Sequence, residues 1–231
     1  MTERLDRIEQ KLDRLLYLLG DGKGKLPSEI RREAPFLRKV TTGCYILALL
    51  LLLSCGGGGG GGTVTASTYP VAVIGDSLSY NLAPYLPADN FGVSGATIED
   101  MIEHIQGEDL SGYSTIYVMA GINDISAWGL TADEVLIRYA VLLDTIRSKS
   151  GARIIVQSTL PMDNLEVNKE VQKLNGQLQA IARKKGCLYI DLWPMFLDLD
   201  TGLMVASKTV DGTHLTADGC REWAGYVKAM Q

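Results

Sequence analysis

The chain has 231 residues, of which 22 are basic and 27 acidic, for a formal net charge of −5 at neutral pH. A hydrophobic fraction of 46% excludes a disordered, highly charged tail protein, and the acidic balance argues against a nucleic-acid partner bound by phosphate neutralisation. The four cysteines form no CxxC pair, which argues against a zinc site, and with only two histidines any histidine-dependent chemistry must use His104 or His214.

Residues 1–39 form a basic segment with one helical pattern. Ten of them are Lys or Arg and seven are Asp or Glu, whereas residues 40–75 carry no charge. Apolar residues recur at alternating spacings of three and four: Leu5, Ile8, Leu12, Leu15 and Leu19. This spacing is typical of the a/d seam of a coiled coil. Because isolated helices this short are marginal in water, the pattern predicts either a homo-oligomer through residues 5–19 or an amphipathic helix lying on a membrane or on its own chain.

Residues 40–55 are an apolar run that predicts a hydrophobic anchor. As a helix the run would reach about 24 Å, short of the roughly 30 Å hydrocarbon core, so it fits the apolar region of an export signal better. Basic residues precede it and none follows before Arg138. The positive-inside rule therefore places the N-terminus in the cytoplasm and the rest of the chain outside the membrane. A buried core helix is the alternative, but the glycines that follow give it no core to join.

The end of this run, Leu-Leu-Ser-Cys at residues 52–55, resembles the lipobox of bacterial lipoproteins. The resemblance implies that Cys55 is acylated and becomes the mature N-terminus in the bacterial cell envelope. Lipoprotein signals usually start close before the apolar run, whereas here about forty residues precede it. Either translation starts later than Met1, or the segment is an uncleaved signal anchor. Residues 56–68, rich in Gly, Thr and Ser, then predict a flexible tether.

Residues 69–231 alternate between short apolar strands and helices and form the globular domain. Strands are predicted at 70–74, 90–93, 114–120, 153–158 and 187–192. Helices are predicted at 78–86, 97–106, 131–148, 167–185 and 216–230. Thr131 and Glu134 form a capping box and Thr216 caps the last helix. This alternation predicts a three-layer α/β/α domain with a five-stranded parallel sheet, whose sites lie at the carboxyl ends of the strands.

Two motifs follow the first two predicted strands. Gly75-Asp76-Ser77-Leu78 places Ser77 at a helix N-terminus, where a nucleophile beside a developing oxyanion would be needed. The alternative is a serine that only caps the helix. Residues 90–95, Asn-Phe-Gly-Val-Ser-Gly, form a glycine-rich turn that can expose a backbone N–H at Gly95.

Two further motifs lie later in the chain. Asn123, in Gly-Ile-Asn-Asp, predicts either an amide donor to an oxyanion or an Asx turn. Asp211 stands three residues before His214, so its carboxylate can orient one ring nitrogen while the other faces a serine; the alternative is a loop aspartate and a surface histidine. His104 lies in the middle of a predicted helix, and we interpret it as solvent-facing.

The blocks GDSL, NxGxxG, GxND and DxxH occur in this order, and together they resemble the SGNH/GDSL hydrolase family over nearly all of the globular domain. The resemblance implies that Ser77 is the nucleophile, that His214 is general base and then acid, and that Asp211 orients His214. It implies an oxyanion hole made by the N–H groups of Ser77 and Gly95 and the amide of Asn123. It also implies a flavodoxin-like fold and a reaction without metal or organic cofactor.

Other polar residues receive structural interpretations. Asp76 and Asp124 are expected to pin their loops by hydrogen bonds. Asp191, at the end of the fifth predicted strand, is the alternative acid of the triad. Cys187 and Cys220 would face an oxidising compartment, but the sequence alone predicts no disulfide between them.

The resemblance implies an esterase that works through an acyl-enzyme. Members of the family cleave acetyl groups from sugars, lysophospholipids, thioesters and aryl esters. No lid insertion is evident, and residues 193–214, interpreted as the longest stretch without a helix, would shape specificity. We expect short-chain or O-acetyl carbohydrate esters outside the cytoplasmic membrane. The alternatives are a lysophospholipase or lipase, an O-acyltransferase with the same site, a non-catalytic surface-binding module, and a membrane scaffold that acts through residues 1–39.

Overall fold

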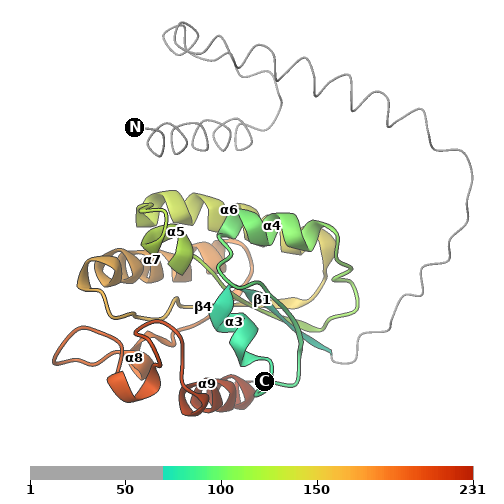
Figure 1. Ribbon diagram of the computed structural model, residues 1–231. Helices are drawn as coiled ribbons and strands as arrows, with labels where there is room; N and C mark the ends of the chain where they lie inside the picture. Colours follow the sequence, from blue (N-terminus) through green and yellow to red (C-terminus); the bar gives the residue numbers. More distant parts are fainter. Residues whose placement is uncertain (1–69, 231) are drawn as a thin grey trace, which may run out of the picture. The chain divides into compact units, whose positions relative to one another are not determined.

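The computed structural model describes residues 70–230. The predictions of a coiled coil, an apolar anchor, a lipidated Cys55 and a tether lie outside these described residues (Figure 1). No helix of the described part is both long and apolar enough to cross a membrane.

One five-stranded sheet organises the described residues, with all neighbouring strands parallel and in the order β2-β1-β3-β4-β5 (Figure 1). The strands are β1 (Val71–Gly75), β2 (Asp89–Gly92), β3 (Thr115–Met119), β4 (Arg153–Gln157) and β5 (Leu188–Ile190). The predicted α/β class and the five strands are confirmed. The order reverses between β1 and β3, which is the switch point where such sheets hold their ligands.

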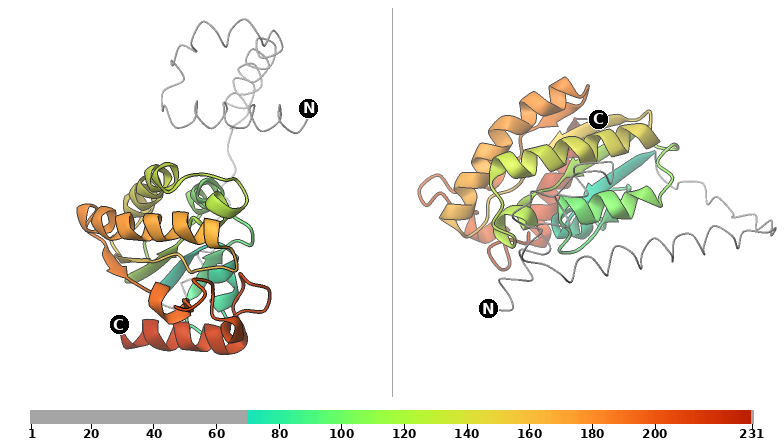
Figure 2. Two further views of the ribbon diagram at one scale, coloured as in Figure 1. Left: turned by 90° about the vertical axis from the view of Figure 1, so that its left-hand side faces the viewer. Right: turned by 90° about the horizontal axis from the view of Figure 1, so that it is seen from above.

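Helices cover both faces of the sheet (Figure 2). One face carries α4 (Ile98–Gln106), α6 (Ala132–Lys149) and α7 (Leu165–Lys184), and the other carries α3 (Ser77–Leu82) and α9 (Ala217–Ala229). Because both faces are covered, the strands are apolar throughout: every residue of β1 and β3 is buried. This arrangement is the predicted three-layer α/β/α domain.

Side-chain caps fix where the longer helices begin. Thr131 caps α6 in a reciprocal capping box with Glu134, and Thr216 caps α9, as predicted. A second capping box, formed by Thr97 and Asp100, starts α4.

Three short elements differ from the sequence predictions. Between β3 and α6 lies α5 (Ile122–Ser126), where no helix was predicted. The stretch 193–214, predicted to lack helix, contains α8 (Trp193–Phe196) and a 3₁₀ turn at Ala206–Lys208. Pro194 lies in the first turn of α8, where its fixed φ and missing N–H suit a helix start.

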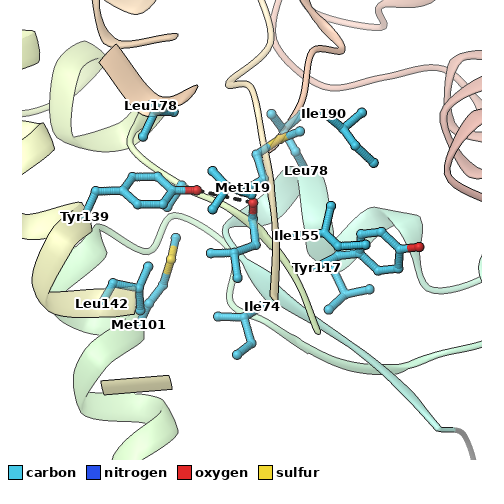
Figure 3. Close-up of a cluster of buried hydrophobic side chains, with 14 of the residues drawn as sticks. Ile74, Leu78, Met101, Tyr117, Met119, Tyr139, Leu142, Ile155, Leu178 and Ile190 are labelled. Carbon is cyan, nitrogen blue, oxygen red and sulfur yellow. Dashed lines mark hydrogen bonds between the residues drawn. The ribbon is translucent and has the colours of Figure 1, made fainter. Parts of the chain in front are cut away.

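The core fills the space between the sheet and both helix layers. Figure 3 shows Tyr139 of α6 reaching the backbone of β3, where its hydroxyl donates to the carbonyl oxygen of Val118 at 3.2 Å. Trp223 of α9 is fully buried on the other face, and its indole N–H donates to Gln157 at 2.7 Å. Both tyrosine and tryptophan thus satisfy their polar atoms inside the core. Cys187 and Cys220 are buried and free.

Candidate active site

The carboxyl ends of β2, β1 and β3, which are neighbours in the sheet, lie in register. Gly75 at the end of β1 pairs with Gly92 of β2 on one side and with Met119 of β3 on the other. The N–H of Val93 donates to the carbonyl oxygen of Gly75 at 3.0 Å, which extends the pairing past the end of β2. The residues that follow these strands therefore meet at one edge of the sheet.

Ser77 begins α3 directly after β1. Asp76, not Ser77, caps this helix: its Oδ1 accepts from the N–H of Leu78 at 2.9 Å. The interpretation of Ser77 as a plain cap is therefore wrong, and its hydroxyl is left for other partners. Gly75 makes the sharp turn possible, because a Cβ there would lie 2.1 Å from Ser79 Oγ and 2.5 Å from the Met119 carbonyl oxygen.

His214 lies between Ser77 and Asp211. Its Nε2 is 3.0 Å from Ser77 Oγ, and its Nδ1 is 2.7 Å from Asp211 Oδ2. The loop that holds the pair is tied back on itself, since Thr209 Oγ1 donates to the His214 carbonyl oxygen at 2.9 Å. Three residues separated by up to 137 positions thus form one hydrogen-bonded chain.

Asp211 is held as an anion. Its hydrogen bond with the His214 ring lowers the pKa of its carboxyl to about 2, and the backbone N–H groups of His214 and Thr213 act in the same direction. A permanently charged carboxylate on Nδ1 favours the tautomer in which Nε2 can accept a proton.

Gly95 lies on the loop that follows β2, and Asn123 lies in α5, the short helix that follows β3. Gly95 has φ of +76°, and no atom lies within 4 Å of the position a Cβ would take. Asn123 is half-buried in the first turn of α5, and its Nδ2 donates to the Ala96 carbonyl oxygen at 3.0 Å. That bond uses one of the two hydrogens of the amide.

Two buried carboxyls lie beneath these loops. Asp124 Oδ2 accepts from the N–H of Ile98 at 3.0 Å, and Asp124 Oδ1 lies 3.4 Å from Arg138 Nη1. Asp76 is fully buried, and its Oδ2 has no hydrogen-bond partner within the described residues. The pKa of Asp76 is raised to about 7, chiefly by burial and also by the nearby charge of Asp124, against the hydrogen bond from the Leu78 N–H, which lowers it. Both aspartates pin loops, as predicted.

The remaining candidates lie elsewhere. Asp191 Oδ1 accepts from the N–H of Trp193 at 3.1 Å, while Asp211 occupies the place beside His214. His104 is exposed in the last turn of α4, as predicted. Arg138 was missed by the sequence motifs, although one signal was available: it falls three residues after Val135 and four before Leu142, on the apolar face of its helix.

A pocket of about 350 Å³ is lined in part by the loop that carries Asp211. None of its lining residues is Lys or Arg within the described chain; they are Asp163, Asp198, Thr201, Leu203, Met204, Ala206, Thr209, Val210, Asp211 and Gly212. The pocket therefore combines carboxylates and hydroxyls with apolar side chains. Sequence reasoning expected this region to shape specificity, but it did not single out Asp163 or Asp198.

Several solved structures share the fold. A Streptococcus pneumonia protein described provisionally as a platelet activating factor superposes with a TM-score of 0.64 at 17% identity, over 73% of this chain and 86% of its own. A GDSL-like lipase from Bacteroides thetaiotaomicron superposes with a TM-score of 0.62 at 17% identity, over 69% of this chain and 86% of its own. The acetyl xylan esterase AlAXEase superposes with a TM-score of 0.60 at 16% identity, over 69% of this chain and 98% of its own. No curated protein matches the sequence.

The sequence profile of the GDSL-like Lipase/Acylhydrolase family matches residues 55–221, which include all three residues of the hydrogen-bonded chain. That span covers most of the 231 residues. The protein is therefore a member of the GDSL-like lipase/acylhydrolase family and an ester hydrolase.

Proposed function

We propose that the protein is a serine esterase with Ser77 as nucleophile, His214 as general base and acid, and Asp211 as the residue that orients His214. The observation that carries the proposal is the continuous chain from Ser77 Oγ through both ring nitrogens of His214 to Asp211 Oδ2, at 3.0 and 2.7 Å. Nucleophile, base and orienting carboxylate within hydrogen-bond distance are the requirement for this chemistry.

The reaction proceeds in two steps. His214 Nε2 takes the proton of Ser77 as Oγ attacks the ester carbonyl carbon, and the carbonyl oxygen becomes an oxyanion. The same proton passes to the alkoxide as the carbon–oxygen bond breaks, and the alcohol leaves. His214 then takes a proton from water, whose oxygen attacks the acyl-enzyme; the acid is released and Ser77 regains its proton.

The oxyanion needs donors in place before the reaction. We assign this role to the N–H groups of Ser77 and Gly95 and to the Asn123 amide. The exposed position and positive φ of Gly95 support the assignment, since they leave room for a substrate oxygen at its N–H. Each such donor is worth about 10²- to 10³-fold in kcat.

The substrate class that best fits is a short-chain or O-acetyl ester of a carbohydrate. The pocket beside Asp211 supports it, because carboxylates and threonine hydroxyls suit the hydroxyls of a neutral sugar and would repel an anionic headgroup. The fold is also shared with an acetyl xylan esterase. The uncharged run of residues 40–55, with basic residues before it, supports a location outside the cytoplasmic membrane.

The test is hydrolysis of p-nitrophenyl esters from acetate to palmitate, and of acetylated xylan, by the full chain and by Ser77→Ala. We expect kcat/KM to fall by about 10⁴-fold or more in the variant. Ser79→Ala is the matched control: it lies in the same helix, and its buried hydroxyl has no hydrogen-bond partner among the described residues.

Each outcome separates one reading from another. A preference for acetate and release of acetate from xylan support the carbohydrate esterase. A preference for palmitate indicates a lipase or lysophospholipase instead. Acyl transfer to an added sugar that outpaces hydrolysis indicates an acyltransferase. If Ser77→Ala equals wild type on every ester, the serine mechanism is wrong.

A further inference from the structure

Arg138 is a buried arginine beneath the candidate active site. It lies on the core side of α6, and its side chain is 10% exposed. Its Nη1 is 3.4 Å from Asp124 Oδ1, and its Nε is 3.6 Å from Glu99 Oε1. Burial of a guanidinium is costly unless anions surround it, so this cluster has a definite arrangement of charge.

Asp124 joins the two loops that carry the proposed oxyanion donors. One of its oxygens faces Arg138, while the other accepts from the N–H of Ile98, the first residue of α4 and three residues after Gly95. Asp124 itself directly follows Asn123 in α5. A single carboxylate therefore spans from the loop after β2 to the loop after β3.

A second bond ties the same two loops together. Asn123 Nδ2 donates to the carbonyl oxygen of Ala96, the residue after Gly95. No side chain packs over Gly95, because the space around its Cβ position is open within 4 Å. The conformation of Gly95 must then be set by the bonds on either side of it rather than by packing.

We propose that Arg138 is a positioning residue for the oxyanion hole. It acts through Asp124, holding that carboxylate so that Gly95 and Asn123 stay at the distance an oxyanion requires, and it does not touch the substrate. It also offsets the negative charge of Asp124 beneath a site where negative charge develops. The inference rests on the proposed esterase function and adds to it a residue outside every recognised motif.

The direct test is Arg138→Gln in the full chain, with p-nitrophenyl acetate as substrate. We expect kcat to fall by about 10- to 100-fold, because displaced donors lose most of their effect in the transition state. We expect KM to stay within about twofold, since the ground-state carbonyl depends little on these donors. Arg138→Lys keeps the charge and should give a kcat between those of wild type and Arg138→Gln. If Arg138→Gln does not fold, the kcat of Arg138→Lys is compared with that of wild type instead.

Arg147→Gln is the matched control. Arg147 lies on the same helix, and its Nη1 donates to the Ala152 carbonyl oxygen at 2.8 Å, just before β4 begins and thus at the opposite edge of the sheet. Arg138 is buried and Arg147 is exposed, so the first variant should lose more stability than the second. Only Arg138→Gln should lower kcat per folded molecule, which is why kcat is compared after correction for the folded fraction.

Hydrogen exchange measured by mass spectrometry gives a readout that needs no activity. Peptides covering residues 93–98 and 120–126 should exchange faster in Arg138→Gln than in wild type. In Arg147→Gln the same peptides should exchange at the wild-type rate. Equal kcat in the two variants, or unchanged exchange in both loops, overturns the inference. If wild type hydrolyses no ester, the proposed function fails, and the exchange data alone decide whether Arg138 holds these loops.

Discussion

Two aspartates of the site differ in the pKa of their carboxyls because their surroundings differ. Asp211 accepts hydrogen bonds from His214 and two backbone N–H groups, which hold its pKa at about 2. Asp76 is fully buried one residue before Ser77, and burial raises its pKa to about 7. A pair of carboxyls with separated pKa values is typical of hydrolytic sites. Here the charged one bonds His214, the proposed base, and the buried one caps the helix that carries Ser77, the proposed nucleophile.

Asp211→Asn tests the orienting role. The amide can donate to Nδ1, which would leave the proton on Nε2 and the wrong tautomer facing Ser77. We expect kcat on p-nitrophenyl acetate to fall by roughly 10²- to 10⁴-fold with little change in stability. Asp191→Asn is the control, because its carboxylate bonds the Trp193 N–H instead. Equal losses in both variants would mean that Asp211 has no special part.

Asp76→Asn tests the buried carboxyl through the pH dependence of stability. The folded-state pKa lies above the ordinary value of 3.8, so the fold favours the neutral form. The contribution of Asp76 to stability is therefore complete below about pH 4 and is lost as pH rises towards 7. Asparagine cannot ionise and keeps an oxygen for the Leu78 N–H.

The measurement is urea denaturation of wild type and Asp76→Asn at several pH values from 4 to 8. We expect the free energy of unfolding of wild type to fall relative to that of the variant between pH 4 and 7, by up to about 1.4 kcal/mol per pH unit. Above pH 7 the difference between the two should become constant. A constant difference across that range would show that Asp76 is ionised in the folded protein.

At the scale of elements, the site depends on how closely α3 approaches the sheet. Gly75 allows the first turn of α3 to pass against the end of β3, and Asn90 holds the helix to β2 by donating to the Ser79 carbonyl oxygen at 2.7 Å. A side chain at position 75 would meet backbone, which cannot move aside cheaply. The conformation of Ser77 thus follows from the packing of one helix.

Gly75→Ala should destabilise the protein by about 1–3 kcal/mol, as overpacking does, and should also lower kcat because Ser77 is displaced from His214. Gly176→Ala is the matched control: it lies in α7 with open space around its Cβ position, and should stabilise by about 0.5–1 kcal/mol. The measurements are thermal unfolding of both variants and of wild type, and their kcat on one ester. A stable and fully active Gly75→Ala would show that the turn adapts.

The longer elements were predictable from sequence because their signals are local. Buried parallel strands are apolar throughout, and capping residues such as Thr131 and Thr216 mark helix starts. Elements of four or five residues, such as α5 and α8, have too few positions for a helical period, so they were missed.

The hydrogen-bonded chain of Ser77, His214 and Asp211 was predictable only through the order of the motifs. Nothing local indicates that Ser77 and His214 meet; the sheet brings them together by aligning strand ends. Arg138 belongs to no motif, and its role depends on the distance to Asp124 across two helices. Its isolated charge on an apolar face was the one local signal, and a fold was needed to interpret it.

At the scale of the whole molecule, the chemistry and the proposed anchoring occupy separate parts of the sequence. Ser77, His214 and Asp211 bond one another within the described residues. Residues 1–39 carry a positive balance, while the uncharged run of residues 40–75 separates them from an acidic remainder. This division is the basis of our proposal that the N-terminal segment anchors the hydrolase domain to a membrane.

A chain that begins at Val64 should therefore keep kcat/KM on p-nitrophenyl acetate within about twofold of the full chain, since Ser77, His214 and Asp211 all lie in the unit that it retains. It should remain in the soluble fraction when expressed in bacteria, whereas the full chain should sediment with membranes. A large loss of activity would assign residues 1–63 a part in the site. A full chain that stays soluble would rule out the anchor.

The mass of the membrane-bound full chain separates the two kinds of anchor. A lipoprotein would begin at Cys55 and carry acyl groups, and Cys55→Ser would retain its full length because processing needs the thiol. A protein with a signal anchor would begin near Met1, in wild type and in Cys55→Ser alike. The substitution would then change the mass only by the difference between the two side chains, and the variant would still sediment with membranes. Only in the second case would the heptad pattern of residues 5–19 be present beside the hydrolase, where crosslinking of the full chain could detect a homo-oligomer.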